Sequence, residues 1–244
     1  MRLALSGLHK SYGADRPPAL SDVDLVVEQH ESVALLGPSG CGKSTLIRLI
    51  AGLEAPSGGE VRLDDRRVSG PTSEVALVFQ EPRLMPWLSV RDNVRLALSG
   101  LDSKAQNRRI DQALATVSLS AFADAWPKQL SGGMAQRAAV ARALVREPSV
   151  LLLDEPFSAL DSFTRTRLQD HLTELWAKAR FTLALVTHDI EEAIVVADRI
   201  VVMKGPPGRI AEDLRVELPR PRERTSAAVQ ALRKRIEAVV AGGV

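Results

Sequence analysis

Short apolar runs alternate along the chain with longer stretches whose apolar positions recur at helical spacing. This alternation is typical of an α/β fold with a largely parallel sheet. Strands that helices cover on both faces are almost continuously apolar, because neither face meets water. Five runs have this character and predict buried strands: Ser32–Leu36, Val75–Phe79, Val150–Leu153, Thr182–Thr187 and Arg199–Met203.

Two segments near the N-terminus, Leu3–Leu8 and Val23–Val27, have the pattern of half-buried strands and predict N-terminal antiparallel strands. From residue 81 to 148 the strand pattern disappears, and Gln106–Val117 and Met134–Arg146 have helical periodicity. We therefore predict a helical subdomain, about residues 81–148, inserted into an α/β core formed by residues 1–80 and 149–218. A tail, residues 219–244, follows the core.

The tail begins with Pro-Arg-Pro-Arg at residues 219–222 and then has the pattern of a helix from about Thr225 to Val240. Either Thr225 or Ser226 can cap this helix. An arginine-proline segment is typical of a solvated extension, although it can also form a ligand site, and the sequence leaves both interpretations open.

Charge and cysteine content exclude several classes of protein. The 32 Lys and Arg residues nearly balance the 30 Asp and Glu residues, so the net charge of +2 does not fit a dedicated nucleic-acid-binding protein. The single cysteine, Cys41, excludes an intramolecular disulfide framework and fits a reducing compartment. Neither a secretory signal nor an apolar run of about 18 residues is present, so we expect a cytosolic chain that can dock on a membrane protein.

One glycine-rich segment carries a specific chemical prediction. Residues 37–44 read Gly-Pro-Ser-Gly-Cys-Gly-Lys-Ser, after an apolar strand and before an amphipathic helix, Ser44–Ala51. This is the phosphate-loop pattern, in which backbone N–H groups and the helix N-terminus surround phosphate oxygens. Lys43 would neutralise the β- and γ-phosphates and Ser44 would bind Mg²⁺. The predicted nucleotide-binding residues are Gly37, Pro38, Ser39, Gly40, Cys41, Gly42, Lys43, Ser44 and Thr45. Cys41 is either a reactive thiol activated by the helix or an unreactive filler residue.

A pair of acids follows a second buried strand. Asp154 and Glu155 come directly after Val150–Leu153, at the carboxyl end of that strand, where α/β sheets bind ligands. Beside a phosphate loop, Asp154 would hold Mg²⁺ and Glu155 would orient or deprotonate the attacking water. A solvated turn before Pro156 is the alternative.

A second loop has the composition of an anion site. Ser131, Gly132 and Gly133 stand at a predicted helix start, between Leu130 and Met134, where bare amides and a hydroxyl can bind phosphate. One nucleotide needs only one such loop, so a second loop suggests a second nucleotide. With this motif, the chain from about Leu3 to Ile210 resembles the ATP-binding cassette (ABC) ATPases, whose signature is usually Leu-Ser-Gly-Gly-Gln. Met134 stands here in place of the glutamine.

The resemblance implies roles for further residues. Ser131, Gly132 and Gly133 would contact the γ-phosphate held by the opposite subunit, so the ATP sites would form in a head-to-tail dimer of two copies. Tyr12 would stack on adenine, or else is a partly buried tyrosine at a strand end. Gln80 would contact Mg²⁺ and link to the helical subdomain.

Two more segments have a counterpart in the family. Ser158-Ala159-Leu160-Asp161 would form a loop at the dimer interface, with a helix cap by Asp161 as the alternative. His188, after Thr182–Thr187, would bond the γ-phosphate as a switch residue, or else is an ordinary loop or helix-cap histidine. Catalysis would therefore depend on Glu155, His188 and Lys43.

Four segments resemble the importers of aliphatic sulfonates, taurine and nitrate: residues 80–87, Trp126-Pro127, residues 154–161 and residues 218–222. This resemblance implies an ATPase that needs ATP and Mg²⁺ and works under a membrane permease, on the cytoplasmic face of the inner membrane. A periplasmic solute-binding protein would deliver the substrate, with sulfonates favoured over taurine or nitrate. Export, or a role outside transport, is the less favoured reading, and no nucleic acid is expected as a partner.

Overall fold

The computed structural model describes residues 1–13, 15–98, 102–158 and 160–242. They form two compact units. The first unit joins Met1–Thr72 to Arg180–Val244, and the second unit is the intervening segment Ser73–Ala179. Because the second unit includes strands as well as helices, its bounds differ from those of the predicted helical subdomain at about 81–148, which stays a prediction.

The first unit begins with a small antiparallel sheet, as the half-buried pattern of its first strands predicted. Its strand order is β2-β1-β4-β5, and Leu3 of β1 lies opposite Val27 on one side and Leu63 on the other. All three of these side chains are buried. The four strands are β1 (Leu3–Lys10), β2 (Leu20–Val27), β4 (Gly58–Leu63) and β5 (Arg66–Arg67).

A second group of strands in the first unit carries the main core. Strand β3 pairs in parallel with β8 on one side and β9 on the other, and β10 pairs antiparallel with β9. Every residue of β3 and β8 is buried, which explains their continuous apolar character. Strand β10 was not predicted, because its exposed polar residues hide the strand pattern. The strands are β3 (Ser32–Leu36), β8 (Thr182–Thr187), β9 (Arg199–Lys204) and β10 (Arg209–Arg215).

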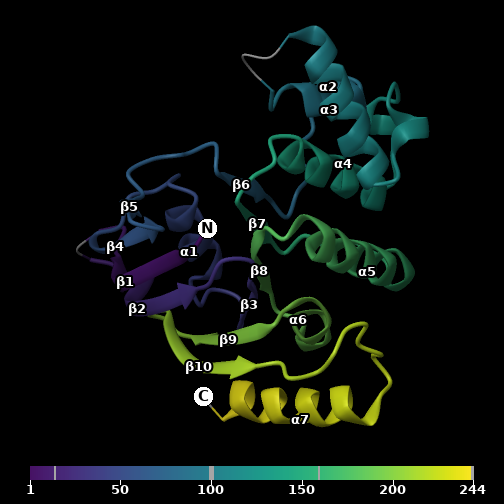
Figure 1. Ribbon diagram of the computed structural model, residues 1–244. Helices are drawn as coiled ribbons and strands as arrows, with labels where there is room; N and C mark the ends of the chain where they lie inside the picture. The colour runs from purple at the N-terminus through teal and green to yellow at the C-terminus, as the bar shows by residue number, and fades with distance from the viewer. Residues whose placement is uncertain (14, 99–101, 159, 243–244) are drawn as a thin grey trace. The chain divides into compact units, whose positions relative to one another are not determined.

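Three helices belong to this unit: α1 (Lys43–Ile50), α6 (Ile190–Val196) and α7 (Ala227–Ala241). The predicted tail helix is confirmed as α7, drawn in yellow in Figure 1, and its N-cap is Ser226, whose hydroxyl accepts from the N–H of Val229. Val229 and Ile236 of α7 are buried in one apolar cluster with residues of α6, β3 and β9. The tail therefore packs as part of the first unit.

The second unit has two parallel strands, β6 (Val75–Val78) and β7 (Val150–Asp154), in register from Val75 opposite Val150 to Val78 opposite Leu153. Helix α4 contacts α2, α3, α5 and β6. The helices predicted at 106–117 and 134–146 are confirmed as α3 and α4, and no strand interrupts the described part of residues 81–148. The helices are α2 (Val90–Arg95), α3 (Ser103–Thr116), α4 (Gly132–Leu144) and α5 (Ser162–Ala179).

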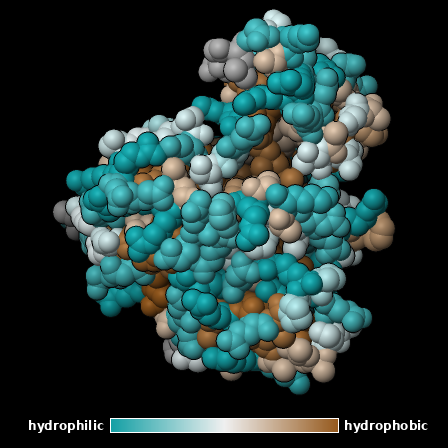
Figure 2. Space-filling model, in the orientation of Figure 1, coloured by the Kyte–Doolittle hydropathy of each residue, from teal (hydrophilic) through white to brown (hydrophobic). Residues whose placement is uncertain are grey.

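On the face drawn in Figure 2, hydrophilic residues predominate and hydrophobic ones show in smaller patches between them. Among the described residues, no helix combines the length and the apolar character that a membrane span requires.

Candidate functional site

The phosphate loop and His188 lie at the same edge of the first unit's sheet. Strands β3 and β8 are parallel, with Leu36 opposite Thr187 at their carboxyl ends. The loop at residues 37–42 continues directly from Leu36, and His188 continues directly from Thr187. Both segments therefore lie at the edge where α/β sheets commonly bind ligands.

Gly42 shows why the loop requires glycine. Its φ of +93° lies in the left-handed region, and it caps the N-terminus of α1. A Cβ atom at this position would lie 2.8 Å from the carbonyl oxygen of Ala19, so no side chain fits. Because Gly42 has no side chain, the backbone N–H groups at the start of α1 are accessible to an anion.

The ammonium of Lys43 lies inside this loop. The side chain is buried, and Nζ donates to the carbonyl oxygens of Gly37 at 2.7 Å and Pro38 at 2.9 Å. A cation and the positive end of a helix therefore converge on the loop, an arrangement that suits phosphate. The other predicted loop and helix residues lie in the same segment: Ser39, Gly40, Ser44 and Thr45.

Cys41 is part of the loop itself. It is 0% exposed, and its Sγ is 3.8 Å from Nζ of Lys43. A thiol without accessible surface does not meet an alkylating reagent in the folded chain. The structure therefore favours the unreactive interpretation of Cys41 over the reactive one.

Tyr12 lies just after β1 and is half exposed, with 51% of its surface accessible. Its hydroxyl donates to the carboxylate of Glu54 at 2.6 Å, and Nζ of Lys10 lies 4.9 Å from the ring centroid. Burial and the hydrogen bond to Glu54 raise the pKa of Tyr12. This placement matches the strand-end tyrosine of the alternative interpretation and leaves ring surface for stacking, so the adenine contact stays a prediction.

His188 is exposed at the junction between β8 and α6. It is not the cap of α6. That role belongs to Asp189, whose carboxylate accepts from the N–H groups of Glu191 at 2.9 Å and Glu192 at 3.1 Å. The helix-cap interpretation of His188 is therefore wrong, and its role as a switch residue stays a prediction.

In the second unit, Gln80, Asp154 and Glu155 lie at the carboxyl ends of the parallel strands β6 and β7. Asp154 is the buried last residue of β7, and Glu155 has a φ of +46°. The Ser158 hydroxyl donates to the carbonyl oxygen of Glu155 at 3.0 Å and accepts from Nε2 of Gln80 at 3.1 Å. The structure thus connects Gln80 to the acid pair through Ser158, a link that the sequence motif alone did not indicate.

Ser131 caps helix α4, and its Oγ accepts from the N–H of Met134 at 3.3 Å. Gly132 and Gly133 form the first turn. A Cβ at Gly133 would lie 2.3 Å from Cγ2 of Thr164 in α5, which accounts for a glycine at this position. The segment is therefore a helix N-terminus without bulky side chains, as the anion-binding interpretation requires.

Asp161 stands before α5, where its Oδ1 accepts from the N–H of Thr164 at 3.0 Å. The hydrogen bonds from Thr164 lower the pKa of the Asp161 carboxyl. The helix-cap interpretation of Asp161 is thus confirmed, and its place at a dimer interface stays a prediction. Ala159, in the same loop, lies outside the described residues.

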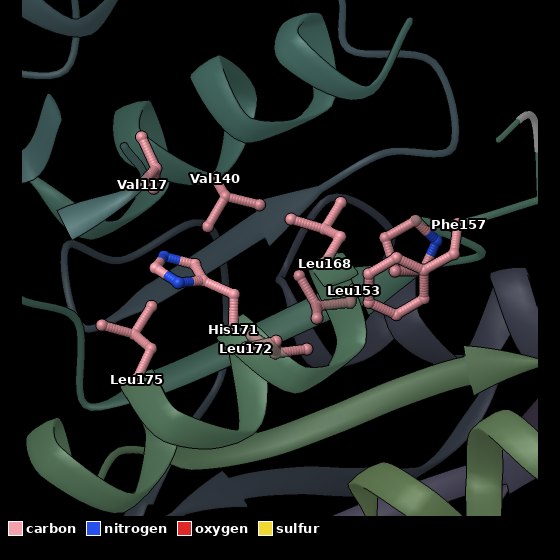
Figure 3. Close-up of a pocket in the computed structure, with 9 residues that line it drawn as sticks. Val117, Val140, Leu153, Phe157, Leu168, His171, Leu172 and Leu175 are labelled. Atoms are coloured by element: carbon pink, nitrogen blue, oxygen red, sulfur yellow. The ribbon is translucent and has the colours of Figure 1, made fainter. Parts of the chain in front are cut away.

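The loop after β7 rests on an apolar pocket in the second unit. Figure 3 shows Leu153 and Phe157 beside Leu168 and Leu172 of α5, and the ring of His171 between Val140 and Leu175. Nε2 of His171 is buried and has no hydrogen-bond partner among the described residues. No role was predicted for His171, and the side chains around its ring are mostly apolar.

The C-terminal arginines correct one interpretation. Arg222 is 7% exposed, so the segment 218–222 is not simply a solvated extension. The guanidinium donates to four backbone carbonyl oxygens, those of Ile194, Ala197, Val216 and Leu218. Sequence reasoning missed this because arginine is rarely buried. Two of its carbonyl partners, Ile194 and Ala197, also lie 28 and 25 positions away in the chain.

Comparison with known proteins identifies the family to which the chain belongs. The family model for ABC transporters matches residues 20–158. The aliphatic sulfonates import ATP-binding protein of Bacillus licheniformis is 44% identical over 97% of this chain and 93% of its own length. One of the same name from Xanthomonas axonopodis pv. citri is 54% identical over 84% of this chain and 82% of its own.

Solved structures agree with the sequence relatives. A dimeric ATP-binding cassette in a post-hydrolysis state, bound to ADP and Pi, superposes with a TM-score of 0.79 at 32% identity, covering 89% of this chain and all of that one. A cassette of a Clostridium perfringens ABC transporter complex gives 0.80 at 29% identity and covers 88% of each chain. The chain therefore belongs to the ABC transporter family, as an ATP-binding cassette ATPase whose hydrolysis is coupled to transport.

Proposed function

We propose that this chain is the ATP-hydrolysing subunit of an importer for aliphatic sulfonates. The observation that carries the substrate class is the name shared by relatives that are 44% and 54% identical over most of the chain. The cassette itself makes no choice among solutes in this proposal, because a permease and a periplasmic solute-binding protein would select the substrate. Taurine and nitrate are the competing substrates.

In this proposal the first unit binds the triphosphate of ATP. The buried ammonium of Lys43 and the bare amides before α1 support a phosphate site, since they supply positive charge without a competing side chain. Tyr12 would stack on the adenine through its exposed ring surface, and His188 would donate a hydrogen bond to the γ-phosphate.

The residues also fit Mg²⁺. The hydroxyl of Ser44, the amide oxygen of Gln80 and the carboxylate of Asp154 are hard oxygen donors, the type that Mg²⁺ prefers. When bound, Mg²⁺ would neutralise charge on the β- and γ-phosphates. The fold would hold these oxygen donors in place, with Ser44 in the first turn of α1 and Gln80 and Asp154 at strand ends.

Glu155 would act on the attacking water. Its carboxylate follows β7 directly, and the bonds from Ser158 to its carbonyl hold the backbone at this point. Loss of a general base typically lowers a rate about 10²- to 10⁴-fold. The second copy of the chain would supply Ser131, Gly132, Gly133 and Asp161 to each ATP, so that closure of a head-to-tail dimer drives the permease at the cytoplasmic face of the inner membrane.

The ATPase assignment is tested with Glu155→Gln, assayed with the assembled transporter. We expect unchanged ATP affinity and a turnover reduced at least 100-fold. The isolated variant chain should elute as a dimer on size-exclusion chromatography when ATP is present. Glu174→Gln, an exposed carboxylate on α5, is the matched control and keeps wild-type turnover. Wild-type turnover in Glu155→Gln would remove Glu155 from the mechanism.

The substrate is tested by uptake of labelled ethanesulfonate, taurine and nitrate in a host that lacks this chain and any redundant ATPase. We expect loss of ethanesulfonate uptake, restored by the wild type and by Lys178→Ala but not by Lys43→Ala. Loss of taurine or nitrate uptake alone would reassign the substrate. Unchanged uptake of all three would reject the oxyanion importer and leave the ATPase activity in place.

A further inference from the structure

The buried arginine of the tail makes an extensive set of contacts. Nε of Arg222 donates to the Leu218 carbonyl at 3.0 Å, and Nη2 donates to that of Val216 at 3.3 Å. Nη1 donates to the carbonyl oxygens of Ile194 and Ala197, each at 2.5 Å. Four of the five guanidinium donors are therefore used, all on backbone acceptors. Burial, followed by the charge of Arg220, lowers the pKa of Arg222 to about 10, while Asp198 acts in the opposite sense.

These acceptors include the last carbonyls of α6. A helix leaves its final carbonyl groups without partners inside the helix. Here Ile194 and Ala197 are 0% exposed, so water does not reach their carbonyl groups. Arg222 supplies the hydrogen bonds that water would otherwise donate. Arg220 adds a bond from Nη2 to the Val196 carbonyl at 2.8 Å and an ion pair with Asp198. The two cations also suit the negative end of the helix.

Further ion pairs join the tail to the other end of α6. Glu191, in the first turn, lies 3.6 Å from Nε of Arg224 and 3.8 Å from Nη1 of Arg233. Val229 and Ile236 of α7 share the apolar cluster with Ala193 and Ile194 of α6. The tail therefore holds α6 at both ends and along one side.

Helix α6 has only seven residues, Ile190–Val196, and a helix of this length is not stable without tertiary contacts. Its N-terminus is connected rigidly to the end of β8. Asp189 caps the helix, its N–H donates to Oγ1 of Thr187 at 2.9 Å, and that hydroxyl donates to the carboxylate of Glu192 at 3.1 Å. His188 lies between these two anchored residues, so its backbone follows the position of α6.

We infer that Arg222, assisted by Arg220, is a positioning residue for His188, and that the C-terminal segment holds the histidine in place by clamping α6. The inference rests on the proposed role of His188 toward the γ-phosphate. By this inference the segment 218–222 is neither a solvated extension nor a ligand site, because its arginines donate hydrogen bonds to the chain's own backbone. A shift of about 1 Å at a catalytic group can cost on the order of 10²-fold in rate, so a remote clamp can control turnover.

The test is a double-mutant cycle on ATP hydrolysis by the full chain in its assembled transporter. Arg222→Met should lower kcat about 10- to 100-fold and change the KM for ATP less than about threefold. In a His188→Ala background, Arg222→Met should have almost no further effect on kcat, because the imidazole that Arg222 positions is already absent. Arg235→Met, an exposed arginine on α7, is the control and should match the wild type in both backgrounds.

A purely structural role for Arg222 would lower kcat by the same factor with and without His188, and that additivity would overturn the inference. If Arg222→Met does not fold, Arg220→Gln takes its place in the cycle. Its effect should be smaller, because the Val196 carbonyl also accepts from the Ser32 hydroxyl at 3.0 Å. If His188→Ala and Glu155→Gln both hydrolyse ATP normally, the proposed function fails. If they do not and the cycle is additive, only the clamp fails.

Discussion

The side-chain amide of Gln80 donates to the hydroxyl of Ser158 at 3.1 Å, although 78 positions separate the two residues in the chain. The same Ser158 hydroxyl donates a hydrogen bond to the carbonyl oxygen of Glu155 at 3.0 Å. Glu155 needs this support because its φ of +46° is uncommon for a residue with a side chain. The residue expected to contact Mg²⁺ and the residue expected to activate water are therefore joined by one serine.

Ser158→Ala should lower kcat for ATP about 3- to 10-fold, because it removes two hydrogen bonds of about 0.5–1.5 kcal/mol each at the backbone that carries the general base. The KM for ATP should change little, since Ser158 lies outside the phosphate loop. Steady-state ATPase kinetics measure both quantities. Ser120→Ala, at an exposed serine, is the control. Normal kcat in Ser158→Ala would mean that the contact does not support Glu155.

Tyr12 is the only tyrosine of the chain, so its ionisation can be followed directly by ultraviolet absorbance. Burial and the hydrogen bond to Glu54 raise its pKa above 10.0. The folded chain thus keeps the phenol protonated where the unfolded chain is already ionised. This contribution to stability is fully present below pH 10 and is lost as the pH rises through the folded pKa.

We expect the titration midpoint of the folded protein to exceed that of the denatured protein, and Glu54→Gln to lower it. Addition of ATP at fixed pH should perturb the phenol spectrum if the ring stacks on adenine. A midpoint equal to that of the unfolded chain would contradict the contact with Glu54. An unchanged spectrum with bound ATP would contradict the stacking role alone.

Gly133 and Gly132 offer a matched pair of substitutions. A Cβ at Gly133 would lie 2.3 Å from Cγ2 of Thr164, whereas at Gly132 the nearest atom is Cδ2 of Leu160 at 3.8 Å, an ordinary contact. Gly133→Ala should therefore destabilise the fold by about 1–3 kcal/mol through overpacking, and Gly132→Ala should not. Thr164→Ser removes the clashing methyl group and should restore most of the loss.

Denaturant unfolding of the wild type, Gly133→Ala, Gly132→Ala and the double variant Gly133→Ala/Thr164→Ser measures these free energies. If Gly133→Ala is as stable as Gly132→Ala, the close approach of α4 to α5 is not what requires a glycine. If Thr164→Ser fails to restore stability, the backbone rather than the methyl group is the obstacle.

Continuous apolar runs made the buried strands of the fold predictable. Ser32–Leu36 and Thr182–Thr187 were predicted with the bounds observed for β3 and β8, because burial on both faces leaves no polar position to confuse the pattern. Strand β10 and helix α5 were missed. Both carry polar or charged residues at positions that tertiary contacts, rather than local periodicity, decide.

The candidate site also has a part that the sequence predicts and a part that it does not. Glycines, a lysine and acids at fixed spacing identify phosphate chemistry from sequence, because that chemistry depends on few residue types. The bond from Gln80 to Ser158 and the burial of Arg222 could not be predicted, since each depends on where distant backbone comes to lie. The motif at Asp161 fits two roles from sequence, and the structure shows the helix-capping contact with Thr164.

His171 gives the last prediction. Its Nε2 is buried without a hydrogen-bond partner among the described residues, in a pocket lined by Val117, Val140, Leu172 and Leu175 (Figure 3). A buried polar atom without a partner costs about 1–3 kcal/mol. His171→Leu has a similar size and no polar atom, so it should stabilise the protein by about 1 kcal/mol, seen as a higher denaturant midpoint with an unchanged slope. His171→Asn keeps a polar group in the pocket and should gain nothing. A lower midpoint for the leucine variant would show that the imidazole is satisfied by an ordered water, and that α5 keeps its histidine for stability.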